Sequence, residues 1–281
     1  MAILSSGVFI AQLATFLLTP VVSRLYPPTV FGLMAFFMSI ATPLTNISSL
    51  KYDQAVLIAD TQASNRILSS LSCRINFIFC VFCMAGIAAL KLSMVGFLPE
   101  LGYWLYLLPF FILISGQINI GNSRCVSQKR FKTISSANIT GGLSTPLLRI
   151  VYAISFSATF FGLILSQLIS NAFKAVILQT HRYEDKRPSI KWPELLKMAK
   201  SHMDFPRYAL PTGLLFSLGN QAPVLMLGFL FEPSIVGFYA LANRLIRMPI
   251  DLISQPIRQV FIQKATEKVR QGDSIAGLFA V

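Results

Sequence analysis

The sequence predicts an all-α, polytopic membrane helix bundle. Hydrophobic residues make up 54% of the 281 residues and charged residues only 12%, whereas soluble domains carry about 25% charged residues. The apolar residues are gathered into long runs, and about 20 such residues span the hydrocarbon core of a bilayer as a helix. A transmembrane barrel would instead show strands of about 10 residues in which apolar and polar residues alternate, and the runs show no such alternation.

Eight runs are long and apolar enough to cross a bilayer as helices. They are residues 2–23, 29–50, 71–93, 101–122, 137–157, 160–180, 208–231 and 234–262. The boundary between the fifth and the sixth is the least sharp, because the segment SFSATFFG at residues 155–162 contains few polar residues. An even number of spans places the two ends of the chain on the same side of the membrane.

Basic residues indicate how these spans are oriented, because lysine and arginine concentrate in the cytosolic loops of membrane proteins. With the N-terminus in the cytosol, the outer loops contain only Arg24 and Lys91. The inner loops and the C-terminal end hold Lys51, Arg66, Arg74, Arg124, Lys129, Arg130, Lys132, Arg182, Lys186, Arg187, Lys191, Lys197, Lys200, Arg207, Lys264, Lys268 and Arg270. We therefore expect a multi-pass membrane protein whose N-terminus and C-terminal end are both cytosolic.

The formal net charge of +13 also raises the alternative of a nucleic-acid-binding protein. The basic residues follow the membrane topology and form no separate basic domain, so we expect no nucleic-acid partner. No glycine-rich loop precedes a helix as a nucleotide site requires, and Cys80 and Cys83 lack the histidine or acidic neighbours of a zinc site. We expect neither an enzyme nor a bound cofactor or metal.

A short internal repeat relates two parts of the chain. PTVFGLMA at residues 28–35 aligns with PSIVGFYA at residues 233–240. The identical pairs are Pro28 and Pro233, Gly32 and Gly237, and Ala35 and Ala240. Each copy follows one apolar run and begins another in the same direction, so the repeat is parallel, as between the halves of some transporters. The offset contains six spans, which makes six helices the repeating unit.

The repeat predicts three parts. Residues 1–180 form an N-terminal six-helix transmembrane lobe, and residues 208–281 form the first two helices of a second, repeat-related lobe. Residues 181–207 form a basic cytosolic linker in which WPELLKMAKSHMDF reads as an interfacial helix. Because a complete second lobe would need about four more helices, we expect the chain to be a fragment or a truncated gene product.

Charged residues within spans are the candidates for function, since each costs about 2.5–3.5 kcal/mol at the centre of a membrane helix. Arg149 lies near the middle of the fifth span. Lys174 lies nearer the cytosolic end of the sixth, where its long side chain can also reach the membrane surface. Arg24 is nearly alone in the outer loops and is a candidate either for anchoring or for substrate exit.

The eighth span carries Arg244, Arg247, Asp251 and Arg258 at spacings that place them on one face of a helix. In a structural interpretation, Asp251 pairs with Arg247 one turn away and Arg258 reaches the cytosolic surface. In a functional interpretation, the stripe and Arg149 line a water-filled cationic cavity. Guanidinium groups suit phosphate oxygens, so the expected ligand of such a cavity is a phosphate or diphosphate head group.

Four stretches of the chain carry a family resemblance. SRLYPPTVFGLMAFFMSI at residues 23–40 and SSLKYDQAVLIAD at residues 48–60 resemble the N-terminal part of the bacterial polysaccharide-export flippases, the Wzx-like translocases of O-antigen and capsule. FPRYALPTGLLFSLGNQAPVLML and VGFYALANRLIRMPIDLISQPIRQVFIQKATE look like the start of the second lobe of that family. The resemblance extends over essentially the whole chain and rests on the order and spacing of these stretches.

This resemblance implies the two-lobed fold of the multidrug/oligosaccharidyl-lipid/polysaccharide exporter superfamily. It implies translocation of an undecaprenyl-diphosphate-linked oligosaccharide across the bacterial inner membrane by alternating access, for O-antigen or capsule biosynthesis. The cavity arginines of the family would correspond to Arg149, Arg244 and Arg247, by depth in the membrane rather than by an invariant motif. The implied partners are the lipid-linked oligosaccharide diphosphate, the lipid bilayer, and polysaccharide polymerase or chain-length proteins.

Two alternatives remain open. The first is a non-transporting membrane protein, either a truncated remnant or a scaffold. The second is a multidrug or cation antiporter of the same fold, which a cationic stripe suits poorly because it repels cationic substrates.

Overall fold

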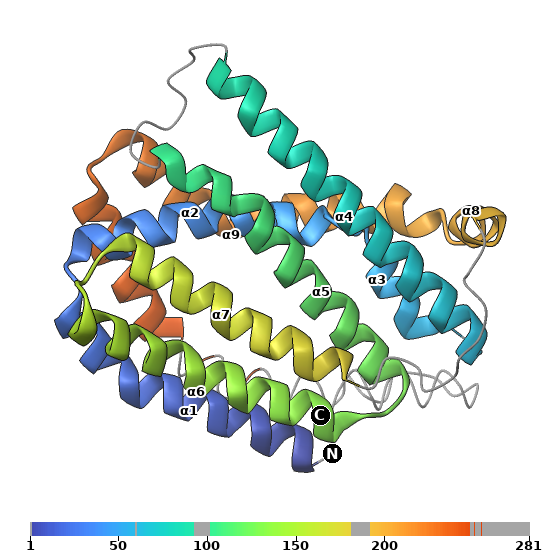
Figure 1. Ribbon diagram of the computed structural model, residues 1–281, viewed down its shortest axis with the longest axis horizontal. Helices are drawn as coiled ribbons and strands as arrows, with labels where there is room; N and C mark the ends of the chain where they lie inside the picture. The colour runs from blue at the N-terminus through green and yellow to red at the C-terminus, as the bar shows by residue number, and fades with distance from the viewer. Residues whose placement is uncertain are drawn as a thin grey trace, which may run out of the picture.

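The computed structural model describes residues 2–59, 61–92, 102–180 and 192–247, together with the single residues 250 and 254. Within these residues all regular secondary structure is helical, which confirms the predicted all-α class (Figure 1). Five stretches are long and apolar enough to cross a membrane, namely Pro28–Ile47, Gln62–Ala89, Gly102–Ser127, Phe160–Gln179 and Phe205–Leu230. The chain is therefore a multi-pass membrane protein.

Five long helices lie side by side in an order that differs from their order in the chain (Figure 1). Across the bundle they follow one another as α1 (Ala2–Leu25), α6 (Phe131–Ser155), α7 (Phe160–Gln179), α5 (Leu108–Ser127) and α4 (Gln62–Leu92). Helix α2 (Pro28–Ile47) packs against α5 and α7, and α9 (Leu210–Leu230) packs against α2. Helix α2 therefore connects α9 to the bundle through its contacts with α5 and α7.

The remaining elements are short. They are α3 (Tyr52–Ala55), η1 (Val56–Ile58), η2 (Gly102–Leu107), α8 (Trp192–Ser201) and η3 (Phe205–Ala209), and residues 233–247 form a further helix after α9. Each of the eight predicted spans overlaps a helix, although the second half of the last span lies mostly outside the described residues. The division of the chain into two lobes stays a prediction.

Local sequence explains where α2 begins and ends. Pro27 is extended (φ −67°, ψ 152°) and Pro28 occupies the first helical position, where the absence of a backbone N–H costs nothing. After Ile47 the chain reaches Leu50 and Lys51, which both have left-handed backbone conformations with φ of 50° and 63°. Those two residues turn the chain away from the axis of α2 and into α3.

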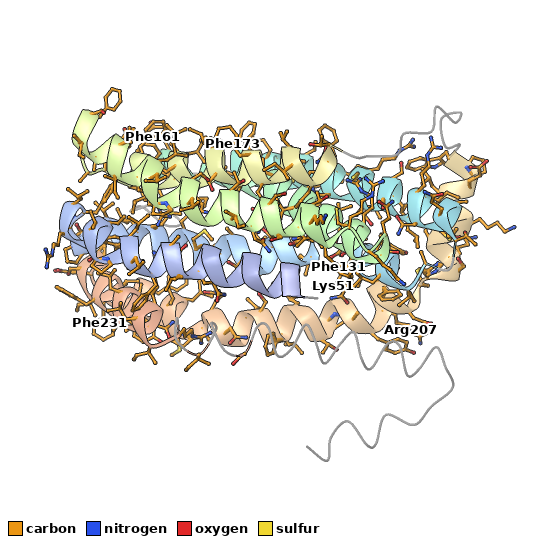
Figure 2. The ribbon with its side chains drawn as sticks, turned by 90° about the horizontal axis from the view of Figure 1, so that it is seen from below. Lys51, Phe131, Phe161, Phe173, Arg207 and Phe231 are labelled. Carbon is orange, nitrogen blue, oxygen red and sulfur yellow. The ribbon has the colours of Figure 1, made fainter. Side chains whose placement is uncertain are left out.

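Aromatic contacts hold α2, α5 and α7 together. The ring of Phe37 is fully buried and lies edge-on to the rings of Phe111 and Phe160, with centroids 5.9 and 6.1 Å away. Such pairs contribute about 0.5–1.5 kcal/mol each beyond the burial of their area. The outer faces of α5 and α7 carry exposed apolar side chains such as Phe110 and Phe173. Figure 2 shows Phe173, and Phe231 just after α9, at the outside of the bundle. A surface of this kind suits contact with lipid.

Helix α8 lies across one end of the bundle and is seen end-on in Figure 1. Leu195 is buried against a cluster that includes Leu68 of α4, and the Tyr52 hydroxyl donates to the carbonyl oxygen of Ala199 at 3.1 Å. The guanidinium of Arg74 lies 5.7 Å from the ring centroid of Trp192. The predicted linker therefore contains a helix that is docked on the bundle, while its contact with the membrane surface stays a prediction.

Candidate anion-binding site

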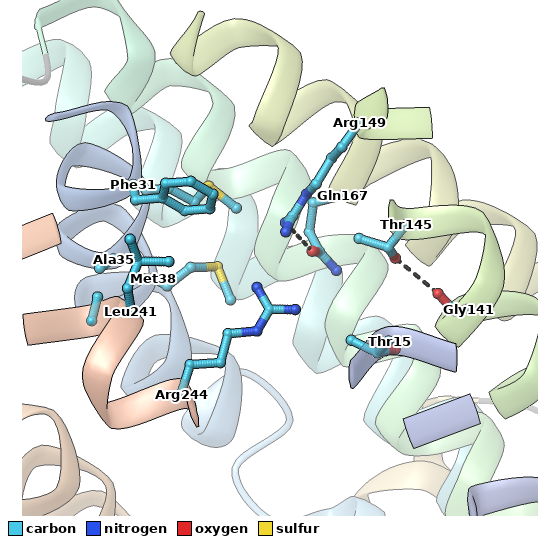
Figure 3. Close-up of a pocket in the computed structure, with 12 residues that line it drawn as sticks. Thr15, Phe31, Ala35, Met38, Gly141, Thr145, Arg149, Gln167, Leu241 and Arg244 are labelled. Atoms are coloured by element: carbon cyan, nitrogen blue, oxygen red, sulfur yellow. Dashed lines mark hydrogen bonds between the residues drawn. The ribbon is translucent and has the colours of Figure 1, made fainter. Parts of the chain in front are cut away.

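A cavity of about 370 Å³ lies where α1, α2, α6, α7 and the helix at residues 233–247 meet (Figure 3). It is named the arginine cavity here, after the two arginines in its wall. The lining residues are Thr15, Phe31, Met34, Ala35, Met38, Gly141, Thr145, Arg149, Gln167, Ala240, Leu241 and Arg244. Among these described residues none is acidic, so the wall carries two positive charges and no negative one.

Arg149 of α6 is held rigidly in the wall. Its side chain is only 6% exposed, and its Nη2 donates to Oε1 of Gln167 at 2.9 Å. The Tyr26 hydroxyl, from the turn between α1 and α2, donates to the backbone carbonyl oxygen of Arg149 at 2.9 Å. The Nε of Arg149 is buried and has no hydrogen-bond partner among the residues that the structure describes. A buried donor without a partner carries a free-energy penalty of about 1–3 kcal/mol, more when it is charged, and a bound anion would remove it.

Arg244 enters the cavity from the opposite side. It lies on the helix at residues 233–247, and Figure 3 shows its guanidinium group pointing toward the guanidinium group of Arg149. Two like charges that face each other in a partly dehydrated site repel one another. An anion between them would turn this repulsion into two attractive contacts, and guanidinium groups bind phosphate oxygens through two hydrogen bonds at once.

The rest of the wall has a polar side and an apolar side. On the polar side, the Thr145 hydroxyl donates to the Gly141 carbonyl oxygen at 2.9 Å, and the Thr15 hydroxyl donates to the Gly142 carbonyl oxygen at 3.1 Å. On the apolar side, α2 contributes Phe31, Met34 and Met38. A cavity with a cationic side and an apolar side fits an amphiphile with an anionic head group better than a freely soluble anion.

The amide of Gln167 is oriented by a chain of hydrogen bonds that leads away from the cavity. Its Nε2 donates to Oδ1 of Asn171 at 3.2 Å, and Nδ2 of Asn171 donates to Oγ of Ser115 at 3.3 Å. Because Nε2 is engaged in this way, Oε1 faces Arg149. Gln167 is therefore a positioning residue for the Arg149 guanidinium.

The structure brings together two of the six predicted site residues, Arg149 and Arg244. Arg247 is exposed, and its Nε donates to Oδ1 of Asn243 at 3.1 Å, outside the cavity. Residues three apart on a helix point about 60° apart, so the cavity receives Arg244 and not Arg247. This differs from the expectation that both arginines line one cavity.

Arg24 and Lys174 do not line the arginine cavity. Arg24 is exposed in the last turn of α1, and Lys174 lies about two turns beyond Gln167 on α7. Asp251 and Arg258 lie outside the described residues. Their predicted roles, including the pairing of Asp251 with Arg247, stay predictions.

Thr15 and Thr145 line the cavity but were not among the predicted site residues. Thr145 lies four residues before Arg149 on α6, so helical spacing alone could have placed both on the same face. No local feature of the sequence marks Thr15, because only the packing of α1 against α6 brings it to the wall.

A family model described as "Polysaccharide biosynthesis protein" matches residues 21–277 of the 281. The match includes both copies of the repeat and both arginines of the cavity. The comparisons with curated proteins and with solved structures gave no match.

Proposed function

The chain belongs to the family of polysaccharide biosynthesis proteins, and on that premise we propose that it acts as a transporter of an anionic, lipid-linked saccharide rather than as an enzyme. The substrate is an undecaprenyl-diphosphate-linked oligosaccharide, as the sequence resemblance implies. The protein moves it from the inner to the outer leaflet of the bacterial inner membrane by alternating access, with both ends of the chain in the cytosol. The translocated lipid-linked oligosaccharide then serves the synthesis of O-antigen or capsule.

The arginine cavity is the observation that carries this proposal. Arg149 and Arg244 face each other there, and among the described residues the lining has no acidic side chain and the Nε of Arg149 has no hydrogen-bond partner. A diphosphate offers several charged oxygens at the spacing that two guanidinium groups can share. The volume of about 370 Å³ accommodates such a head group but not a long oligosaccharide, so we assign the cavity to the diphosphate.

The apolar side of the cavity supports a lipid-linked substrate. Phe31, Met34 and Met38 belong to α2, which packs against α9 along a seam between two long apolar helices. The isoprenyl chain of the substrate can remain among such side chains while the diphosphate reaches the arginines. A cation or cationic drug would meet two positive charges that no acidic residue of the described lining compensates, which disfavours the antiporter alternative.

Binding of an isoprenyl diphosphate to the purified chain in nanodiscs tests the proposal. We expect Arg149→Gln and Arg244→Gln each to weaken the binding of farnesyl diphosphate by at least tenfold, because each removes a charge-assisted contact of about 1.5–3 kcal/mol. Arg247→Gln is the matched control, since Arg247 lies on the same helix as Arg244 but outside the cavity. Farnesol, which lacks the diphosphate, should not compete.

Equal affinity in the wild type and in both cavity variants would refute the assignment of the diphosphate. Binding that depends on both arginines, without restoration of surface polysaccharide in a strain lacking its own flippase, would favour the non-transporting alternative.

A further inference from the structure

The two copies of the internal repeat touch each other in the structure, through their glycines. A methyl group built on Gly32 of α2 would overlap the carbonyl oxygen of Pro233 and would lie 2.9 Å from the backbone nitrogen of Gly237. A methyl group built on Gly237 would overlap the carbonyl oxygen of Pro28 and would lie 3.1 Å from the backbone nitrogen of Gly32. The glycine of each copy therefore packs directly against the proline carbonyl group of the other copy.

This reciprocity gives the contact a local two-fold symmetry. Gly32 and Gly237 are paired in the sequence alignment, as are Pro28 and Pro233, and in space each member contacts the unlike member of the other pair. Small interface residues such as glycine allow membrane helices to approach until their backbones meet, and at that separation Cα–H groups contact carbonyl oxygens. The contact between Gly32 and Gly237 is named the glycine crossing below.

The glycine crossing lies at one end of the arginine cavity. Ala35 and Ala240, each three residues after its glycine, both line the cavity. The prolines on the other side of the glycines begin the two helices, at the end of the bundle that is predicted to face outward. The crossing therefore stands between the cavity and that end, and Arg244, seven residues after Gly237, projects into the cavity about two turns further in.

We infer that the glycine crossing closes the outer mouth of the arginine cavity, and that Gly32 and Gly237 are positioning residues which allow its two walls to meet. The substrate leaves when α2 and the helix at residues 233–247 separate at this point. At the crossing itself the two helices touch through backbone atoms of the glycines and prolines. This role rests on the proposed transport, whereas the closure itself can be measured without any substrate.

Cysteine labelling from the outside of intact cells tests the closure. The four native cysteines, Cys73, Cys80, Cys83 and Cys125, are first replaced by alanine, and Ala240→Cys then reports on the cavity. In this background a membrane-impermeant maleimide should label the protein slowly. Gly32→Ala and Gly237→Ala should each raise the labelling rate at least tenfold, because a methyl group forces the two backbones apart.

The matched controls are Gly86→Ala on α4 and Gly219→Ala on α9, because a methyl group on either glycine meets nothing within 4 Å. Both should leave the labelling rate unchanged. An unchanged rate in Gly32→Ala and Gly237→Ala would overturn the inference.

Rapid labelling of Ala240→Cys without any glycine substitution would also overturn it, and this measurement does not depend on the folding of the glycine variants. The outcome is separate from that of the proposed function. Slow labelling that the glycine variants accelerate, together with diphosphate binding that ignores Arg149 and Arg244, would leave the closure in place and remove the assigned substrate.

Discussion

Replacement of Arg149 by methionine tests directly whether this arginine serves a ligand or the fold. Its side chain is 6% exposed, and its Nε has no hydrogen-bond partner within the described part of the chain. Replacing buried ion pairs by apolar residues of similar size is often neutral or stabilising by about 1–4 kcal/mol, because the cost of keeping the charges away from water disappears, and the same kind of cost applies to a single buried arginine. The lost bond from Nη2 to Gln167 offsets this by about 1–3 kcal/mol. The two contributions are of similar size, so we expect the unfolding free energy of the unliganded protein to change by no more than about 2 kcal/mol in either direction.

The stabilisation of the protein by a bound diphosphate should, in contrast, be lost. At a concentration one hundred times its Kd, a diphosphate that binds only the folded state stabilises the wild type by about 2.7 kcal/mol. At about 2–4 °C per kcal/mol for a chain of this size, this raises the Tm by several degrees. In Arg149→Met the rise should disappear. Thermal unfolding in nanodiscs, with and without farnesyl diphosphate, measures both quantities.

Arg124→Met is the control for a buried arginine that serves the fold. Arg124 is 3% exposed, and its Nη2 donates to the carbonyl oxygen of Leu178 at 2.7 Å, near the C-terminal end of α7. This substitution should lower the Tm and leave the shift by farnesyl diphosphate intact. If Arg149→Met lowered the Tm as Arg124→Met does, and the ligand still stabilised it, Arg149 would be a structural residue and our reasoning would be wrong.

Three further substitutions test contacts of Arg149 and of the aromatic core. Gln167→Glu places a carboxylate where Oε1 now accepts from Arg149, so it should neutralise the guanidinium and weaken diphosphate binding about tenfold, or 1.4 kcal/mol; equal affinity in a titration would contradict this. Phe37→Ala removes a fully buried ring from the contact of α2, α5 and α7 and should destabilise the protein by about 3–5 kcal/mol, seen as a lower Tm, with Phe173→Ala at an exposed position as its control. Tyr26→Phe loses the hydroxyl that donates to the Arg149 carbonyl oxygen; it should cost about 0.5–1.5 kcal/mol of stability, and a Tm equal to that of the wild type would show that this bond contributes nothing.

Much of the helix layout could be predicted from the sequence, because a membrane helix can be recognised from its own residues without knowledge of its neighbours. A run of about 20 apolar residues is long enough to span a bilayer whatever it packs against, so each predicted span overlaps a helix. Pro28 marks the start of α2 for an equally local reason, since its ring fits only the first turn. Helices α4 and α6 begin earlier than the predicted spans, at Gln62 and Phe131, because polar residues outside the apolar run continue the helix.

The site was only partly predictable. Depth within a span made Arg149, Arg244 and Arg247 equally strong candidates, because a charge in the membrane is costly on any face of a helix. Which of them faces a cavity depends on the rotation of each helix against its neighbours, and the structure turns Arg244 inward and leaves Arg247 exposed. The support of Arg149 by Gln167 and Tyr26 joins three segments that no spacing rule connects.

The repeat shows the same division between local and tertiary information. The sequence by itself determined that the chain is a bundle of membrane helices, that a few of its basic residues lie within spans, and that Gly32 and Gly237 are equivalent, since apolar length, charge and similarity are properties of the chain alone. Only the tertiary structure decided that these equivalent glycines meet each other and that Arg149 and Arg244 share one cavity. The physical reason is that the distance between two helices is set by the smallest side chains between them, and those side chains come from segments far apart in the sequence.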